Sequence, residues 1–162
     1  MKYLYLVRHA KSSWEYNLDD FDRPLNKRGE FDAPLMGKIL AGKDIKPALI
    51  ISSPASRAIK TATIIAEYLQ YKKPIGTLNE LYHASATNLL QIVKKTSSLH
   101  QSLMVFGHNP GLTTFANQLT VDQVDNIPTC GIYAIVFNNN DWDTIGLKKG
   151  KLLFHDFPKN HK

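Results

Sequence analysis

The sequence predicts an α/β fold, namely a single-domain, three-layer α/β/α sandwich with a mostly parallel sheet. Short apolar runs of strand type alternate along the chain with segments that repeat apolar residues every three or four positions, and this alternation is typical of such domains. The 162 residues are enough for one domain with one core. We therefore expect residues 1–162 to form one domain, with a lysine-rich tail that frays from about residue 158.

The first half of the chain is expected to begin with a buried strand at residues 3–7. After a long polar loop, Asn26 can cap a helix that reaches about Ala41, and Pro34 should kink that helix. The apolar run ALIISS then predicts a second strand. The segment PASRAIKTATIIAEYL begins with proline, which favours helix starts, and continues with helical periodicity.

The second half is expected to repeat this pattern and then to change it. A brief strand at 75–78 should lead to a helix at 86–97, and the segment 102–119 again has a strand, a polar turn and a helix. The remainder, from residue 131, has two or three strand-like runs separated by turn residues. This suits antiparallel pairing at one edge of the sheet.

Composition limits the classes of function. The apolar fraction of 43% and the charged fraction of 21% are those of an ordinary globular protein, and no apolar run is long enough for a membrane helix. We expect no secretory signal and a cytoplasmic location. The net charge of +6 comes from scattered lysines and arginines without a basic stripe, so neither a nucleic acid nor a membrane is an expected partner. The single cysteine, Cys130, is expected to be a small buried residue, and no residue spacing suggests a metal or another cofactor.

Three polar turns follow apolar strands and lead toward helices. They are VRHAK, SSPASRA and GHNPG, and together they supply Arg8, His9, Arg57 and His108. Because the carboxyl ends of parallel strands meet at one edge of a sheet, we expect these four side chains to converge.

The chemistry of these residue types indicates a phosphate site. Guanidinium groups donate paired hydrogen bonds to phosphate oxygens, and the helix N-termini that follow two of the turns add partial positive charge. A neutral imidazole can attack phosphorus, and two neighbouring arginines should lower the pKa of His9 and keep it unprotonated. We therefore predict that His9 is a nucleophile and that His108 donates to the phosphoryl oxygens.

These motifs resemble those of the histidine phosphatase superfamily, which has the phosphoglycerate mutase-like fold. The family signature Arg-His-Gly is present as RHA, with Ala10 in place of glycine, and SSPASRAIKTA, GHNPGL and RPLNKRGEFDA are similar to its other motifs. The resemblance extends from Lys2 to about Leu119 and is greatest for the short branch of phosphohistidine phosphatases of the SixA type. It implies a cofactor-independent mechanism in which His9 takes up the phosphoryl group and water then releases it, while Arg8, Arg57 and His108 bind that group and stabilise its charge.

Two further residues are candidates because of the resemblance. Glu80, in LNELYHAS, occupies the position where longer members carry a general acid, although a helix-capping or solvated charge is the alternative. Ser12 has the spacing of a serine that lines the pocket in larger members, or it is a solvated turn residue. Arg23 and Arg28 could contact substrate, or they could form ion pairs with Asp20, Asp22 or Glu30.

The expected function is that of a phosphatase with a covalent phosphohistidine intermediate. The chain has room for little beyond the core of the fold, so the pocket should be open and should accept phosphate displayed on a protein, including phosphohistidine on a histidine phosphotransfer domain. The alternative is a phosphatase of small phosphate monoesters with the same residues. A non-catalytic phosphate-binding module is a third possibility, and the presence of His9 argues against it.

Overall fold

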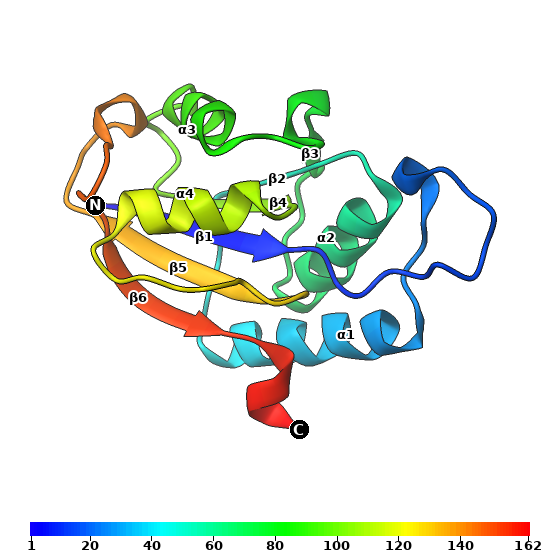
Figure 1. Ribbon diagram of the computed structural model, residues 1–162. Helices are drawn as coiled ribbons and strands as arrows, with labels where there is room; N and C mark the ends of the chain where they lie inside the picture. The colour runs from blue at the N-terminus through cyan, green and yellow to red at the C-terminus, as the bar shows by residue number, and fades with distance from the viewer.

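A six-stranded sheet runs through the middle of the computed structural model, which describes residues 1–162 (Figure 1). The strand order is β3-β2-β4-β1-β5-β6. The strands are β1 (Lys2–Arg8), β2 (Leu49–Ser52), β3 (Gly76–Thr77), β4 (Ser102–Gly107), β5 (Ile132–Phe137) and β6 (Lys151–Asp156). The helices are α1 (Lys27–Gly42), α2 (Ser56–Tyr68), α3 (Ala86–Lys94) and α4 (Gly111–Leu119), with short 3-10 helices η1 (Asp20–Asp22), η2 (Asn79–Leu81), η3 (Trp142–Thr144) and η4 (Pro158–His161).

The pairing of the strands confirms the predicted sheet. β1, β2, β3 and β4 pair in parallel, whereas β5 is antiparallel to both β1 and β6, as expected for the last part of the chain. Arg8 of β1 is in register with Gly107 of β4, and Ser52 of β2 is in register with Phe106 of β4. The carboxyl ends of the three central parallel strands are therefore level.

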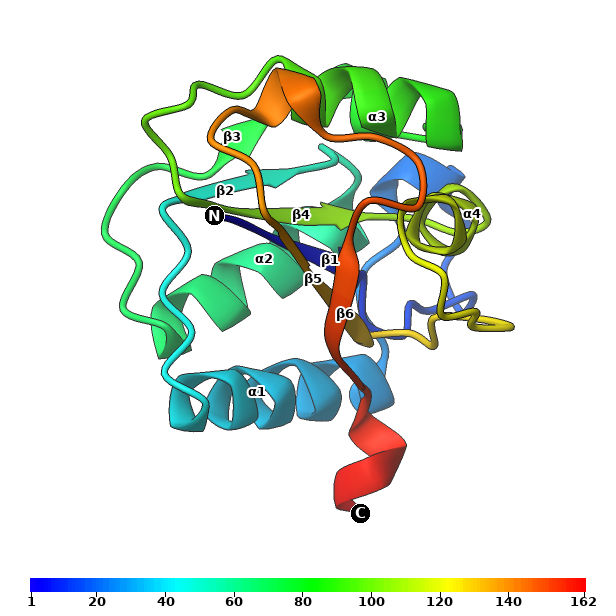
Figure 2. The same cartoon turned by 90° about the vertical axis from the view of Figure 1, so that its left-hand side faces the viewer.

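Helices cover both faces of the sheet, and Figure 2 shows α1 and α2 on one side and α3 and α4 on the other. Each pair buries its apolar stripe against the strands, which gives two clusters of 20 and 18 buried apolar residues, one on each face. Since both faces are covered, β4 and β5 are buried along their whole length, which explains their unbroken apolar sequences. None of the helices is both long and apolar enough to span a membrane.

Helix α1 begins as predicted, because the side chain of Asn26 accepts a hydrogen bond from Gly29 N at 2.9 Å. The helix continues through Pro34 to Gly42. A Cβ at Gly29 would collide with the carbonyl group of Lys11, so glycine allows the first turn to pack directly on the chain that follows β1.

Two helix boundaries differ from the expectation. α2 begins at Ser56, two residues after Pro54, and α3 ends at Lys94 rather than at Ser97. The hydroxyl group of Ser97 accepts a hydrogen bond from Leu99 N in a turn. Serine side chains compete in this way with helical hydrogen bonding, which ends the helix early.

The last residues, where the sequence predicts fraying from about residue 158, form the 3-10 helix η4 in the structure. Pro158 is buried at the start of η4. His161 Nε2 lies 2.8 Å from Asp156 Oδ2, and Lys162 Nζ lies 2.7 Å from Asp32 Oδ1 in α1. The contact between His161 and Asp156 orders the tail locally, whereas the ion pair between Lys162 and Asp32 holds the terminus against α1, and no local sequence pattern reveals that pair.

Candidate active site

The three motif turns meet at the carboxyl edge of the sheet, as the sequence predicts. His9 N donates to Gly107 O at 3.2 Å, and Ser53 N donates to Phe106 O at 3.0 Å. These backbone hydrogen bonds continue the sheet for one residue beyond β1 and β2. The side chains that follow each strand are thus fixed on a rigid edge.

His9 is buried, with 8% of its surface exposed. Its Nδ1 lies 2.8 Å from the carbonyl oxygen of Ala10, and because a carbonyl can only accept, Nδ1 carries the proton and Nε2 keeps a free lone pair. Burial lowers the pKa of His9 to about 4, with further lowering by the charges of Arg57 and Arg8. The imidazole is therefore neutral at pH 7. Burial lowers the pKa of His9 more than the two arginines do, whereas the sequence analysis predicted the lowering from the arginines alone.

Alanine fits at position 10 without strain. Ala10 is fully buried, it is not among the residues with positive φ, and its N–H donates to Thr61 Oγ1 in α2 at 2.9 Å. The backbone after His9 thus has a conformation that alanine adopts as readily as glycine, and this hydrogen bond anchors it.

His108 faces His9 with 5.2 Å between the ring centroids. Its Nε2 lies 2.8 Å from Ser53 Oγ, while its Nδ1 is buried without a hydrogen-bond partner. Burial lowers the pKa of His108 to about 3, and the neighbouring His9 and Arg57 lower it further. Ser53 is a contact residue that the sequence analysis missed, although it stands in the quoted SSPASRA motif.

Arg8 and Arg57 supply the positive charge beside the two histidines. Arg8 Nη1 donates to Ile127 O at 3.1 Å, and its Nε is buried without a partner. Burial, and then the charge of Arg57, lowers the pKa of Arg8. Arg57 lies at the start of α2 with 5% of its surface exposed. Arg8 is half-buried, and because the two positive charges repel each other, an anion bound beside both guanidinium groups would offset that repulsion.

The helices add to the positive potential at this edge. α2 starts beside Arg57 without a side-chain N-cap, so its first N–H groups face the edge unpaired. α4 starts three residues after His108. The arrangement suits an anion with several oxygens. No group of three or more His, Cys, Asp and Glu side chains is placed to hold a metal ion.

Asp20, which the sequence analysis did not select as a site residue, connects three parts of the site. Its Oδ2 accepts hydrogen bonds from Arg57 Nη2 at 2.9 Å and from Tyr82 Oη at 2.7 Å, and its Oδ1 pairs with Arg23 at 2.9 Å. Burial alone would raise the pKa of Asp20, but the hydrogen bonds from Tyr82, Arg23 and Arg57 hold it well below its usual range. The loop between β1 and α1 is thereby tied to Arg57.

Tyr82 and His83 lie on the loop before α3, beside the histidine pair. The ring of His83 stacks on Tyr82 with 3.9 Å between centroids and lies 6.1 Å from the ring of His108. Its Nε2 is 3.9 Å from Asp20 Oδ2. A Cβ at Gly111 would collide with the carbonyl group of Ala84, so this loop packs directly on the start of α4.

Ser12, Arg23 and Arg28 lie outside the cluster of Arg8, His9, Arg57 and His108. Ser12 is buried and accepts a hydrogen bond from Arg23, so it reaches the site through that arginine. Arg23 forms the expected ion pair with Asp20, whereas Arg28 lies 3.4 Å from Asp32 rather than near Glu30. Asp32 is one helical turn after Arg28, where such pairs form.

The structure does not bring Glu80 into this cluster by any hydrogen bond or ion pair. Its side chain is exposed and lines a separate hollow of about 400 Å³ together with Leu49, Ile92 and Lys95. The role of Glu80 as a general acid therefore stays a prediction.

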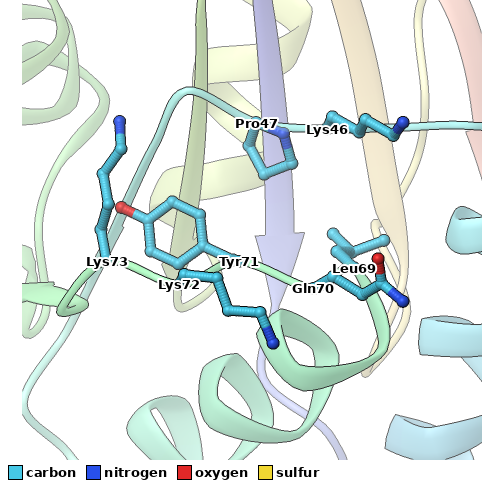
Figure 3. Close-up of a pocket in the computed structure, with 7 residues that line it drawn as sticks. All are labelled: Lys46, Pro47, Leu69, Gln70, Tyr71, Lys72 and Lys73. Atoms are coloured by element: carbon cyan, nitrogen blue, oxygen red, sulfur yellow. The ribbon is translucent and has the colours of Figure 1, made fainter.

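Two hollows of similar size lie at opposite edges of the sheet. One, of about 390 Å³, adjoins the histidine pair and is lined by His83, Ser85, His108, Asn109 and Thr114, among others. The other, also about 390 Å³, lies where α2 ends and β2 begins, and its lining residues are Lys46, Pro47, Leu69, Gln70, Tyr71, Lys72 and Lys73 (Figure 3). The second hollow has no histidine or arginine.

Comparisons with known proteins agree with this geometry. Residues 4–87 match the model of the histidine phosphatase superfamily (branch 1). An uncharacterised chloroplastic protein of Arabidopsis thaliana is 31% identical over 150 residues, which cover 86% of this chain and 68% of that protein. An Agrobacterium tumefaciens structure described as a phosphohistidine phosphatase, SixA, is 25% identical with a TM-score of 0.84 and covers 97% of this chain and 98% of that one. The fold is also that of a protein histidine phosphatase SixA in complex with tungstate, with a TM-score of 0.85, 20% identity and 99% of both chains covered.

Proposed function

The chain belongs to the histidine phosphatase superfamily (branch 1), and we propose that it is a phosphatase which removes the phosphoryl group from phosphohistidine or another phosphorylated side chain of a protein. The observation that carries the proposal is the cluster of the buried residues His9, Arg57 and His108 with the half-buried Arg8, in which two buried nitrogens, Arg8 Nε and His108 Nδ1, have no protein partner. Buried polar groups are normally hydrogen-bonded, and a phosphoryl group offers the oxygens that these nitrogens lack.

In the first step His9 Nε2 attacks phosphorus. The free lone pair forms the Nε2–P bond, the bond from phosphorus to the leaving atom breaks, and the leaving atom keeps its electron pair and takes up a proton. The hydrogen bond to Ala10 O and the rigid end of β1 hold the imidazole in line for this attack. Arg8, Arg57 and His108 stabilise the charge that spreads over the three equatorial oxygens.

In the second step water attacks the phosphorus of phosphohistidine. The new P–O bond forms as the Nε2–P bond breaks, the electron pair of the broken bond returns to His9, and the attacking water releases a proton to solvent. Because burial and the arginines favour the neutral imidazole, His9 is a good leaving group here and regains its starting state without a cofactor.

The leaving group decides how much acid catalysis is needed. A leaving imidazole has a pKa near about 6.5, whereas an alcohol has a pKa near ~15 and benefits strongly from a proton donor. Glu80 is the donor that the family resemblance suggests, yet its exposed carboxylate has no contact with the cluster. This supports substrates whose leaving group departs easily, of which phosphohistidine is one.

A phosphatase of small phosphate monoesters is the second candidate, since the hollow of about 390 Å³ beside His83 and His108 has polar side chains and room for such a molecule. The resemblance to the Agrobacterium protein at 25% identity over 97% of this chain favours phosphohistidine.

The test is a comparison of kcat/KM for phosphohistidine, phosphoserine and phosphotyrosine peptides and for small esters, in the presence and absence of EDTA. We expect the highest value for phosphohistidine and no effect of EDTA. A preference for a small alkyl ester would favour the second candidate. Activity that EDTA abolishes and Mg²⁺ or Zn²⁺ restores would contradict the cofactor-free mechanism.

A further inference from the structure

The loop between β1 and α1 exposes a group of large apolar side chains. Trp14, Tyr16, Leu18 and Phe21 fall within eight consecutive positions, yet they are four of the eleven exposed large hydrophobic residues in the chain. Trp14 is 75% exposed and Tyr16 is 59% exposed. Single exposed apolar residues are common, but four within one short loop next to a site are a candidate interaction surface. We call these four residues the loop surface.

The loop surface borders the phosphate site. The loop, dark blue in Figure 1, projects beyond the carboxyl end of β1. Its Asp20 is bonded to Arg57 through both the side chain and the backbone carbonyl. The ring of Phe21 packs edge-on against Tyr82, which in turn lies 5.5 Å from the ring of His108. Whatever carries a phosphate into the site must therefore lie next to this loop.

Hydrogen bonds and stacking hold the loop in one conformation. Arg23 Nε donates to Ser13 O at 3.0 Å, and the guanidinium carbon of Arg23 lies 3.2 Å from the centroid of the Trp14 ring. A rigid aromatic surface loses little conformational entropy when a partner binds, and tryptophan and tyrosine contribute most to binding in protein interfaces. Tyr16 also lines a hollow of about 450 Å³ between the loop and the start of α1, together with Glu15 and Arg28. This hollow can take a side chain of a partner.

We propose that the loop surface docks the protein that carries the phosphorylated side chain, an inference that rests on the proposed function. A small ester would bind within the site itself. Tyr16 and Leu18 form no hydrogen bond or ion pair with any residue of that site, so a small ester does not account for their exposure. Of the four acidic residues in segment 13–22, Asp20 is paired with Arg23 and Arg57, but Glu15, Asp19 and Asp22 form no ion pair, so an anionic lipid surface would be repelled. A protein partner with an apolar patch beside its phosphorylated residue fits both the exposed rings and the charge.

The test compares two substrates with the same leaving group, which are a histidine-phosphorylated phosphotransfer domain and free phosphohistidine. In the variant Tyr16→Ser/Leu18→Ser we expect kcat/KM for the domain to fall about tenfold or more through KM, as the loss of an interface hot spot would produce. The value for free phosphohistidine should stay within about twofold. The control is Leu99→Ser/Val121→Ser, since Leu99 and Val121 are 87% and 74% exposed at the other edge of the sheet. We expect no change for either substrate in this control.

Several outcomes would overturn the docking proposal. In the Tyr16→Ser/Leu18→Ser variant, these are an equal loss of kcat/KM for both substrates, or no loss for the domain. An equal loss of kcat/KM in the control variant would also overturn it, as would a wild-type enzyme that cleaves free phosphohistidine as well as the domain. If only the Tyr16→Ser/Leu18→Ser variant loses binding to anionic vesicles, while its hydrolysis of the domain is unchanged, the surface binds a lipid. If that variant instead loses self-association, again with unchanged hydrolysis, the surface binds a second copy of the chain. Failure of the proposed function looks different, because wild type would then cleave neither phosphohistidine substrate and no phosphoserine or phosphotyrosine peptide.

Discussion

Cationic side chains gather at both edges of the parallel sheet, but they are arranged differently. At the carboxyl edge Arg8, Arg57 and the two histidines are mostly buried and converge. At the amino edge the amine groups of Lys46, Lys72 and Lys73 point away from one another (Figure 3). Lys73 Nζ donates to Ala48 O at 2.6 Å, and all three lysines are exposed.

The difference shows that positive charge alone does not make an anion site. An exposed lysine is strongly hydrated and screened by salt, so it gains little from a bound anion. Buried guanidinium and imidazole groups have already lost their water, and rigid strand ends fix their directions. The predictions that follow separate the two edges, beginning with the largest expected effect.

The largest effect is expected at the proposed nucleophile. His9→Ala removes the nitrogen that would form the covalent intermediate, so turnover should fall below about 1% of wild type. The variant should still bind phosphate or tungstate, because Arg8, Arg57 and His108 remain. Calorimetric titration with tungstate, together with single-turnover kinetics, measures both properties, and residual activity above that level would remove His9 from its role.

Arg57→Lys keeps the charge at the carboxyl edge but loses the paired donors. Loss of one such donor from a transition-state site costs about 10²- to 10³-fold in kcat, and we expect a decrease in this range. The matched change at the other edge, Lys72→Ala/Lys73→Ala, should leave kcat/KM within about twofold. Similar losses in the two variants would mean that overall charge, rather than local geometry, supports activity.

Burial of the histidines predicts a pH-dependent stability. The pKa of His9 is about 4 and that of His108 about 3, both below the ordinary value of 6.5. Above pH 6.5 both histidines are neutral in the folded and unfolded states and the full stability is present. As the pH falls from 6.5 toward 4, the unfolded chain binds protons that the folded protein does not, so stability should decrease by up to about 1.4 kcal/mol per pH unit for each histidine.

Urea unfolding at pH 7, 6, 5 and 4.5 measures this decrease. The double variant His9→Gln/His108→Gln should reduce the slope over that range and leave the contribution of His155, whose pKa burial also lowers. Lys72→Gln/Lys73→Gln, at the amino edge, should not change its slope. A wild-type profile that is already flat above pH 4.5 would contradict the burial of neutral imidazoles.

The smallest effect with a phosphohistidine substrate is expected for Glu80→Gln. Imidazole leaves readily without an added acid, so the rate should stay within about threefold, while a general acid would be worth about 10²- to 10⁴-fold for an alkyl phosphate. A large loss confined to the alkyl phosphate would assign the acid role to Glu80. The same large loss with both substrates would mean that Glu80 acts through positioning or stability.

Much of the fold and the four central side chains could be predicted from local patterns. Strand and helix periodicity is local, and parallel strands place their carboxyl ends together whatever the details of the loops, so Arg8, His9, Arg57 and His108 had to share one edge. The antiparallel pairing of β5 with β6 followed from short apolar runs separated by turns.

Contacts between distant loops could not be predicted in this way. Asp20 meets Arg57 and Tyr82, which are 37 and 62 positions away, and Lys162 meets Asp32 across the whole chain. Such pairs depend on the path of each loop over the packed body, and each ion pair joins a buried residue, Arg57 or Asp32, to a charged group far away in the sequence. No composition or spacing rule distinguishes them from the other charged pairs that the chain could form.

The sequence by itself determined the alternation of strands and helices, because hydrophobic periodicity is a local property. It also determined the edge at which two arginines and two histidines gather, because the carboxyl ends of parallel strands lie at one edge of the sheet. Only the tertiary structure decided how those groups behave. Packing excludes water from His9 and His108 and so lowers their pKa values, and the carbonyl group of Ala10 selects the tautomer of His9. Asp20 ties the aromatic loop to Arg57, while the side chain of Glu80 lies in another hollow. Burial and side-chain direction depend on all the surrounding elements at once, which is why they appear only in the folded molecule.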